Sequence, residues 1–259
     1  MRQTPANDAP DRHGEAGMTR NLEAAGEVVS NYCRWNLSVF RIPRGARILD
    51  IGCGPGLYVD AVAEYQPAAY LGTDHSPAFV EEARKRIGGR AHYRAEVLDI
   101  LASQDLRATL ETGGFDCALC FDVIEHLPDD VSAHRNIRDA MQALGAKRLF
   151  LRVPALPWLY GENDRAIGHY RRYTKASLKA AMESAGFELR QLAYQNIVGV
   201  LPWLIIGRVQ RRELAVSRGE GRLFDALVPA LRWAERIIPP PIGLSVYCEA
   251  TPQITDERS

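Results

Sequence analysis

The sequence predicts an α/β fold in which helices cover both faces of a mostly parallel β-sheet. Three observations support this prediction. Short apolar runs alternate along the chain with segments in which apolar residues recur at helical spacing. The first run, Ile48 to Ile51, leads directly into three glycines, and the next run ends in Asp74. Ligands of parallel sheets bind beyond the carboxyl ends of the strands, so we expect the functional residues at that edge.

The elements follow in order along the chain. Strands are expected near 47–51, 69–73, 91–95, 116–121, 147–153, 187–194 and 244–250. Helices are expected near 20–40, 57–65, 77–87, 104–111, 131–143 and 175–185. Residues 196–242 separate the last two strands, far more than the 2–5 residues or so that a hairpin loop needs. This helical insertion combines an apolar segment, several arginines and an amphipathic helix from Leu223 to Ile237.

The composition fits one domain built around one core. The chain has 259 residues, and 32 basic residues balance 32 acidic ones. Nucleic-acid-binding proteins usually carry a basic surface, so we expect no nucleic-acid partner. Five cysteines without regular spacing indicate a reduced, cytoplasmic setting rather than a disulfide framework. The polar residues 1–17 are expected to form a disordered tail, and residues 18–259 a single domain.

The glycine turn is the most specific feature. Asp50 lies within the apolar strand, which is costly unless the carboxylate has a partner. Gly52, Gly54 and Gly56 follow, and a strand, a glycine turn and a helix bring main-chain N–H groups close to a ligand. The third glycine comes one residue earlier than in the dinucleotide-binding fingerprint. The alternative is a tight turn without a ligand.

These residues resemble the first motif of the class I methyltransferases that use S-adenosylmethionine. The resemblance continues in order through 72–76, 97–100 and 115–127, and it covers residues 44–195 well. Residues 168–174, Gly-His-Tyr-Arg-Arg-Tyr-Thr, resemble a signature in a subgroup of bacterial small-molecule methyltransferases. The family implies a Rossmann-like sheet of seven strands, mostly parallel, with the last strand antiparallel.

The resemblance also implies which residues bind S-adenosylmethionine and its product, S-adenosylhomocysteine. Asp74 is suited to the ribose hydroxyls, Asp50 to the methionine part and Asp99 to the adenine amino group. The alternative for each acid is a helix N-cap or a solvated carboxylate. The expected donor site consists of Asp50, Gly52, Cys53, Gly54, Gly56, Asp74, His75, Asp99, Ile100 and Phe121.

Two histidines are the candidate catalytic residues. His126 follows the fourth strand, and imidazole is a suitable general base because its ordinary pKa is near neutrality. His169 lies in residues 154–173, a ring-rich loop that is expected to cover the acceptor. The alternative for each is a structural histidine. The expected acceptor contacts are Trp158, Tyr170, Arg171 and Arg172.

The structural alternative for the loop is that Asp164 pairs with one arginine. No metal is expected, because Cys117 and Cys120 lie in an apolar run without a second pair of ligands.

Methyl transfer to an oxygen or nitrogen of a small molecule is the function that these motifs favour. A natural product, a sugar or a lipid-linked intermediate are the candidate acceptors, and the protein is expected to be a monomer or a homodimer. One alternative is a non-catalytic module of the same fold, with a peripheral membrane or partner contact through 197–212. A nicotinamide oxidoreductase is disfavoured by the glycine spacing. The longest apolar stretch, 197–207, is too short to span a membrane, which takes roughly 20 residues.

Overall fold

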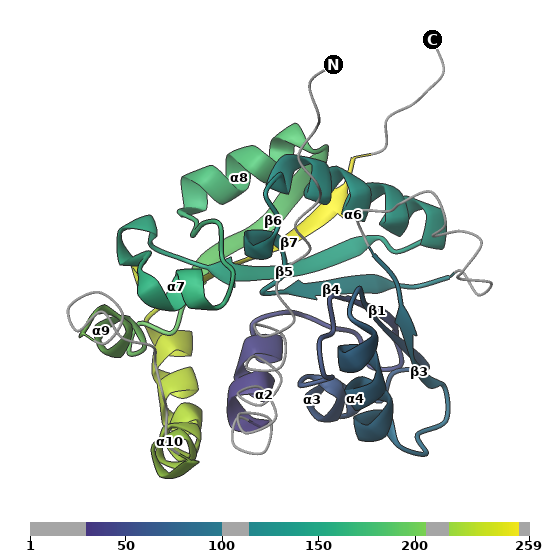
Figure 1. Ribbon diagram of the computed structural model, residues 1–259, viewed down its shortest axis with the longest axis horizontal. Coiled ribbons are helices and arrows are strands. Elements are labelled where there is room, and N and C mark those ends of the chain that lie inside the picture. The colour runs from purple at the N-terminus through teal and green to yellow at the C-terminus, as the bar shows by residue number, and fades with distance from the viewer. Residues whose placement is uncertain (1–29, 100–113, 206–217, 254–259) are drawn as a thin grey trace, which may run out of the picture.

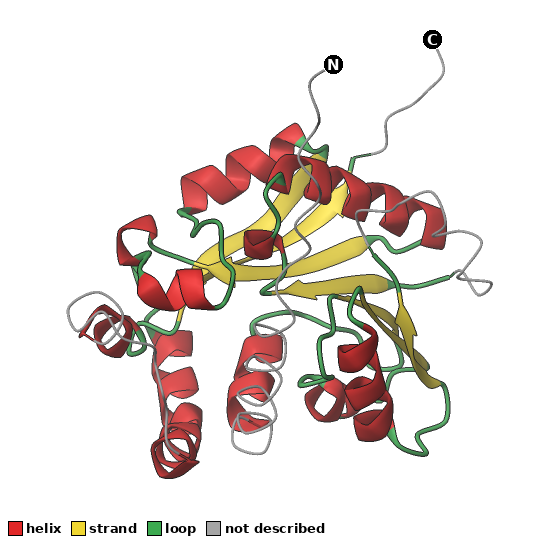
Figure 2. Cartoon of the chain, in the orientation of Figure 1, coloured by secondary structure: helices red, strands yellow, loops and turns green. Residues whose placement is uncertain are grey.

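The computed structural model describes residues 30–99, 114–205 and 218–253, and these form one sheet with helices on both sides (Figures 1 and 2). Its strands are β1 (Arg47–Ile51), β2 (Ala69–Asp74), β3 (Tyr93–Val97), β4 (Cys117–Phe121), β5 (Arg148–Pro154), β6 (Phe187–Gln195) and β7 (Ser245–Pro252). Its helices are α2 (Ser30–Ser38), α3 (Val59–Ala63), α4 (Pro77–Ile87), α6 (Asp130–Leu144), α7 (Glu162–Ala166), α8 (Lys175–Ser184), α9 (Val200–Trp203) and α10 (Arg218–Ile237). Two short 3₁₀ helices are η2 (Ile124–His126) and η3 (Pro157–Leu159).

The described residues form a seven-stranded sheet in the order β3-β2-β1-β4-β5-β7-β6. Strands β3, β2, β1, β4 and β5 are parallel, with Leu49 opposite Leu71 on one side and Ala118 on the other. Strand β7 is antiparallel to both β5 and β6. The predicted fold class, with an antiparallel last strand and a helical insertion before it, is confirmed.

Each face of the sheet has its own apolar core. Leu49 and Ala118 pack with α6 and α8, as shown by buried Ile137 and Met182. On the other face, Ile48 packs with α2, α3 and α4. Because both faces are covered, the central strands β1, β4 and β5 are mostly apolar, which explains the apolar runs in the sequence. The five cysteines are free and buried, including Cys117 and Cys120 in β4.

Helices α4 and α8 each begin at a side-chain N-cap. The Ser76 hydroxyl accepts from the N–H of Phe79, and Pro77 occupies the first turn of α4. The Thr174 hydroxyl accepts from the N–H of Ser177 at the start of α8. The helix expected near 104–111 and the tail at 1–17 lie outside the described residues.

The insertion between β6 and β7 contributes α9 and α10. Helix α10 runs beside α2 and extends away from the sheet (Figure 1). Both carboxylate oxygens of Asp225 in α10 accept main-chain N–H groups of α2, from Asn31 at 3.2 Å and Tyr32 at 3.0 Å. Among the helices of the described residues, none combines the length and hydropathy that a membrane span needs.

Candidate active site

The turn after β1 is open to a ligand at its tip. Gly52 and Gly54 have φ values of 69° and 54°, a region that other residues rarely adopt. A Cβ on Gly52 would lie 2.3 Å from Cγ2 of Val123, so the chain just before η2 packs directly on the turn. A Cβ on Gly54 would meet no atom within 4 Å. The main chain at Gly54 can therefore approach a bound molecule closely.

Asp74, at the end of β2, holds the glycine turn in place. Its Oδ2 accepts from the N–H of Gly54 at 3.0 Å, and its Oδ1 accepts from the N–H of Ser76 at 2.9 Å. Exposed His75 lies beside it, with Nδ1 3.4 Å from Oδ1. Each carboxylate oxygen has two lone pairs, so Asp74 can still accept from the hydroxyls of a ligand.

Asp50 and Cys53 support the turn from the sheet side. The hydroxyl of Tyr70 donates to Oδ2 of Asp50 at 2.7 Å, which supplies the partner that a buried acid requires. Burial raises the pKa of Asp50 to about 7, although the hydrogen bond from Tyr70 lowers it. Burial also raises the pKa of the Cys53 thiol far above its usual value. Their predicted contact with the donor stays a prediction.

Other predicted donor-site residues line the same edge. Phe121, the last residue of β4, stacks on Phe40 with ring centroids 5.6 Å apart and meets Tyr58 edge to face. Asp99 is exposed in the loop after β3. Ile100 lies outside the described residues.

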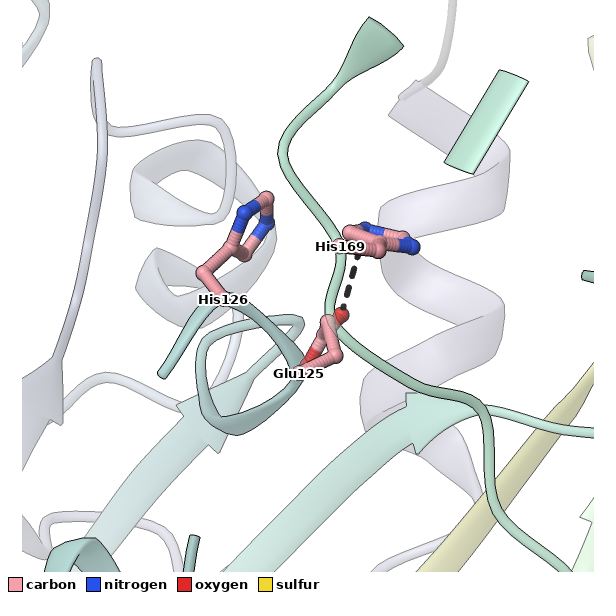
Figure 3. A group of neighbouring side chains, drawn as sticks. All are labelled: Glu125, His126 and His169. Atoms are coloured by element: carbon pink, nitrogen blue, oxygen red, sulfur yellow. Dashed lines mark ion pairs between the residues drawn. The ribbon is translucent and has the colours of Figure 1, made fainter. Parts of the chain in front are cut away.

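Glu125, His126 and His169 meet at the carboxyl end of β4 (Figure 3). The two imidazole rings lie edge to face, with centroids 4.6 Å apart. His169 Nε2 is 3.7 Å from Oε1 of Glu125, and its Nδ1 is 3.0 Å from Oδ1 of Asp164. The side chain of His169 is thus held between two carboxyl groups, while His126 is only half-buried.

Burial shifts the pKa values of His126 and Glu125. Burial, together with the neighbouring His169, lowers the pKa of His126 to about 4. His126 is therefore neutral at neutral pH. Glu125 is fully buried, and its carboxyl oxygens have no hydrogen-bond partner among the described residues. Burial, together with the charge of Asp122, raises the pKa of Glu125 well above its usual value.

The same three side chains offer ligands of the kind that zinc binds. One ligand atom of each lies within 4.8 Å of the others. Imidazole nitrogens and carboxylate oxygens are common zinc ligands. Since the donor set fits such an ion, the expectation that the protein needs no metal stays a prediction.

Asp164 of α7 organises residues 154–173. It accepts from Nε of Arg172 at 2.7 Å and from the N–H of Gly161 at 3.0 Å. Burial raises the pKa of Asp164, but the hydrogen bond from His169 and the charge of Arg172 outweigh it and lower the pKa overall. Asp164 is therefore an ionised carboxylate at the centre of the segment.

The structure corrects the prediction that Arg172 binds the acceptor. The side chains of Arg172 and Asp164 are only 1% and 0% exposed. Nη1 of Arg172 donates to the carbonyl of Ala155 at 3.0 Å, and the ring of Trp203 covers the guanidinium at 4.6 Å. A guanidinium with these partners is not available to a ligand, so the structural alternative describes Arg172.

The remaining acceptor candidates differ in their surroundings. Trp158 and Tyr170 are exposed on the surface of the same segment, and the N–H of Tyr170 donates to the carbonyl of Glu125 at 2.7 Å. Arg171 lies 3.1 Å from Oδ1 of Asp130 at the start of α6. Their contact with an acceptor stays a prediction.

Sequence reasoning missed a buried network around Arg152 of β5. Its guanidinium forms an ion pair with Asp122 and donates to the hydroxyls of Tyr32 at 2.6 Å and Ser245 at 2.8 Å. The network ties α2 to the carboxyl ends of β4 and β5. An arginine inside the apolar run 149–153 was the available signal, by the reasoning applied to Asp50.

Comparison with known proteins identifies the reaction class of the residues at the carboxyl ends of the strands. A family model described as a methyltransferase domain matches residues 49–146, which include the glycine turn, Asp74 and η2. A ubiquinone biosynthesis O-methyltransferase of Xanthomonas axonopodis pv. citri is 29% identical over 214 residues, covering 76% of this chain and 82% of the relative. The chain is an S-adenosylmethionine-dependent methyltransferase.

Solved structures share the fold of this methyltransferase. A TehB-like S-adenosylmethionine-dependent methyltransferase from Corynebacterium glutamicum has a TM-score of 0.53 and 21% identity, covering 93% of this chain and 98% of the other. A phosphoethanolamine N-methyltransferase of Haemonchus contortus, in complex with S-adenosyl-L-methionine, has a TM-score of 0.54 and 17% identity, covering 85% of this chain and 52% of the other. At these identities the likeness concerns the fold alone.

The described residues of the methyltransferase fit its methyl donor. The space at Gly54 admits a ligand beside the main chain, and Asp74 retains acceptor capacity next to it. His126 lies on the element that packs against the same turn through Val123. The arrangement places a neutral imidazole near the expected donor site.

Proposed function

We propose that this methyltransferase methylates a hydroxyl oxygen of a small-molecule acceptor, with His126 as the general base. The observation that carries the proposal is the neutral imidazole of His126 in η2, the short helix that directly follows Val123, which packs on the glycine turn. A general base must be unprotonated and within hydrogen-bond reach of the proton that it removes. The O-methyltransferase name of the relative from Xanthomonas supports oxygen as the acceptor atom.

The reaction is an in-line displacement. The acceptor oxygen forms a bond to the methyl carbon while the bond from that carbon to sulfur breaks, and sulfur keeps the electron pair. The hydroxyl proton passes to His126. Since the sulfonium is already activated, the protein mainly positions the two molecules. His169 is a positioning residue in this proposal, because Asp164 fixes its Nδ1 and its ring contacts His126.

Donor binding gives the first test. S-adenosylhomocysteine is expected to bind with micromolar affinity and to raise the melting temperature, because a ligand of the folded state stabilises it by about 2.7 kcal/mol at 100 times its dissociation constant. Isothermal titration calorimetry and thermal unfolding measure the two effects. NAD serves as the matched control and should do neither. Binding of NAD without binding of S-adenosylhomocysteine would contradict the assignment.

Replacement of Asp74 by alanine is expected to weaken donor binding by about 1.5–3 kcal/mol, the scale for hydrogen bonds to a charged group. The melting temperature of the unliganded protein should also fall, because the N–H groups of Gly54 and Ser76 lose their acceptor. Calorimetry well below the melting temperature separates the two effects. Asp139→Ala removes an exposed acid from α6 and should change neither. An unchanged dissociation constant would show that Asp74 only holds the turn.

A further inference from the structure

Two acids of helix α10 connect the insertion to the rest of the fold. Glu235 accepts from the N–H groups of Asn196 at 3.1 Å and Ile197 at 2.9 Å, where the chain leaves β6. Asp225 accepts from two main-chain N–H groups of α2. At a rise of 1.5 Å per residue the two acids are about 15 Å apart along the helix. Helix α10 therefore links the end of β6 to α2, beside which it runs (Figure 1).

The contact between Asp225 and α2 is buried and uses every acceptor that Asp225 offers. Its Oδ2 accepts from the N–H of Asn31 and its Oδ1 from the N–H of Tyr32. The side-chain amide of Asn31 also donates to the carbonyl of Asp225 at 3.1 Å. The neighbouring ring of Phe224 packs against Tyr32 with centroids 5.9 Å apart. Hydrogen bonds to a carboxylate are stronger than those to a neutral acceptor, so Asp225 fixes α2 at this point.

Tyr32 connects α2 to the sheet. Its hydroxyl accepts from Nη2 of Arg152 in β5 at 2.6 Å, and the guanidinium lies 5.4 Å from the centre of its ring. The other side-chain partners of Arg152 are Ser245 and Asp122, and its Nε has no hydrogen-bond partner among the described residues. The position of this buried guanidinium therefore depends in part on Tyr32.

Asp122 is the last residue in this chain of contacts, and it directly follows β4. Its carboxylate pairs with Arg152, and its N–H donates to the carbonyl of Arg152 at 2.9 Å. Its φ is 57°, a conformation that persists in a residue other than glycine only where surrounding contacts impose it. Phe121 of the predicted donor site precedes it, and Val123, which packs on the glycine turn, follows it. Arg152 therefore holds the backbone that leads from β4 into η2.

We propose that Asp225 of the insertion is a positioning residue for the donor site. It fixes α2, and through Tyr32 and Arg152 it holds the backbone of Asp122 beside the glycine turn. A contiguous network of hydrogen bonds and ion pairs can carry such coupling between distant parts of a protein, and each step of this network is a hydrogen bond or an ion pair. The insertion thus supports the donor site from the side of α2. The inference rests on the donor site at the glycine turn and does not depend on His126 as the base.

Hydrogen exchange and ligand binding of the full chain test the proposal. In Asp225→Ala, amide exchange measured by mass spectrometry should accelerate in α2 and also in residues 121–127, which Asp225 does not contact in the described part of the chain. Calorimetry well below the melting temperature should show that S-adenosylhomocysteine binds about 3-fold to 30-fold more weakly, the range for residues of such a network. Glu249→Ala is the matched control, since it removes the partner of Arg148 at the amino end of β5 and should change neither quantity.

Tyr32→Phe tests the path of the coupling, because it removes the hydroxyl that binds Arg152 and keeps the ring and the main-chain N–H. It should also accelerate exchange in residues 121–127 and weaken binding of S-adenosylhomocysteine. If Asp225 acts through Tyr32, the double variant Asp225→Ala/Tyr32→Phe should bind S-adenosylhomocysteine no more weakly than the weaker of the two single variants.

Three results would overturn the proposal. One is faster exchange that is confined to α2 and α10 in Asp225→Ala. Another is an unchanged affinity for S-adenosylhomocysteine in both single variants. The third is an additive loss of affinity in the double variant, because Asp225 and Tyr32 would then act independently. A wild-type chain that does not bind S-adenosylhomocysteine would contradict the donor site itself, and this inference with it.

Discussion

Replacing His126 with alanine is expected to lower turnover by about 100-fold or more, the scale of general-base catalysis. Affinity for S-adenosylhomocysteine should remain nearly unchanged, because no main-chain contact of the glycine turn depends on the imidazole. Steady-state kinetics with labelled donor and calorimetry measure the two quantities. His92→Asn is the matched control. His92 is exposed in the turn before β3, at the amino ends of the strands, whereas His126 lies at their carboxyl ends.

The pH dependence gives an independent readout of the same residue. A histidine with its ordinary pKa loses its function as a base as pH falls through 6.5, whereas His126 should remain a base until the pH approaches about 4. In the unfolded chain His126 takes up its proton near the ordinary value. Its neutral burial therefore contributes stability above pH 6.5, and that contribution is lost as pH falls from 6.5 toward 4. Full turnover of His126→Ala across neutral pH would show that positioning alone drives the transfer.

Replacing Asp164 with alanine is expected to lower the free energy of unfolding by about 3–5 kcal/mol, because the buried charge of Arg172 loses the carboxylate that forms its ion pair. In a chain of this size the melting temperature should fall by roughly 6–20 °C. Denaturant unfolding measures the loss. Glu162→Ala, two residues earlier, breaks an exposed pair with Arg165 and should cost about 1 kcal/mol or less.

A double variant tests whether the loss of stability in Asp164→Ala comes from the unpaired buried charge of Arg172. Asp164→Ala/Arg172→Met removes both partners and should regain part of the stability that Asp164→Ala loses. If Asp164→Ala and Glu162→Ala lose equal stability, Asp164 does not organise residues 154–173.

The sequence predicted the sheet well because its signals are local. Runs such as Ile48 to Ile51 and caps such as Ser76 depend on neighbours within a few residues. The segment 154–173 was harder, since two adjacent arginines look alike in the sequence. Only the fold shows that Arg172 points inward to Asp164 while Arg171 reaches Asp130. Periodicity says nothing about such pairings.

The network of Arg152 illustrates the same limit across a longer separation. Its partners Asp122 and Tyr32 lie 30 and 120 residues away in the chain. The cost of a buried guanidinium predicts that partners exist, but not which ones. Strand order decides this, because β4 and β5 are neighbours and α2 lies over their ends.

The position of β7 determines when the sheet of this enzyme can close during synthesis. Strand β7 inserts between β5 and β6, although it is synthesised after both. Until it arrives, β5 and β6 each present an unpaired edge, which is the kind of surface that recruits other chains. Ser245, the partner of Arg152, also arrives with β7. A nascent chain on the ribosome therefore carries the glycine turn and His126 before the sheet beneath them closes, and the two strand edges stay open to other chains during that interval.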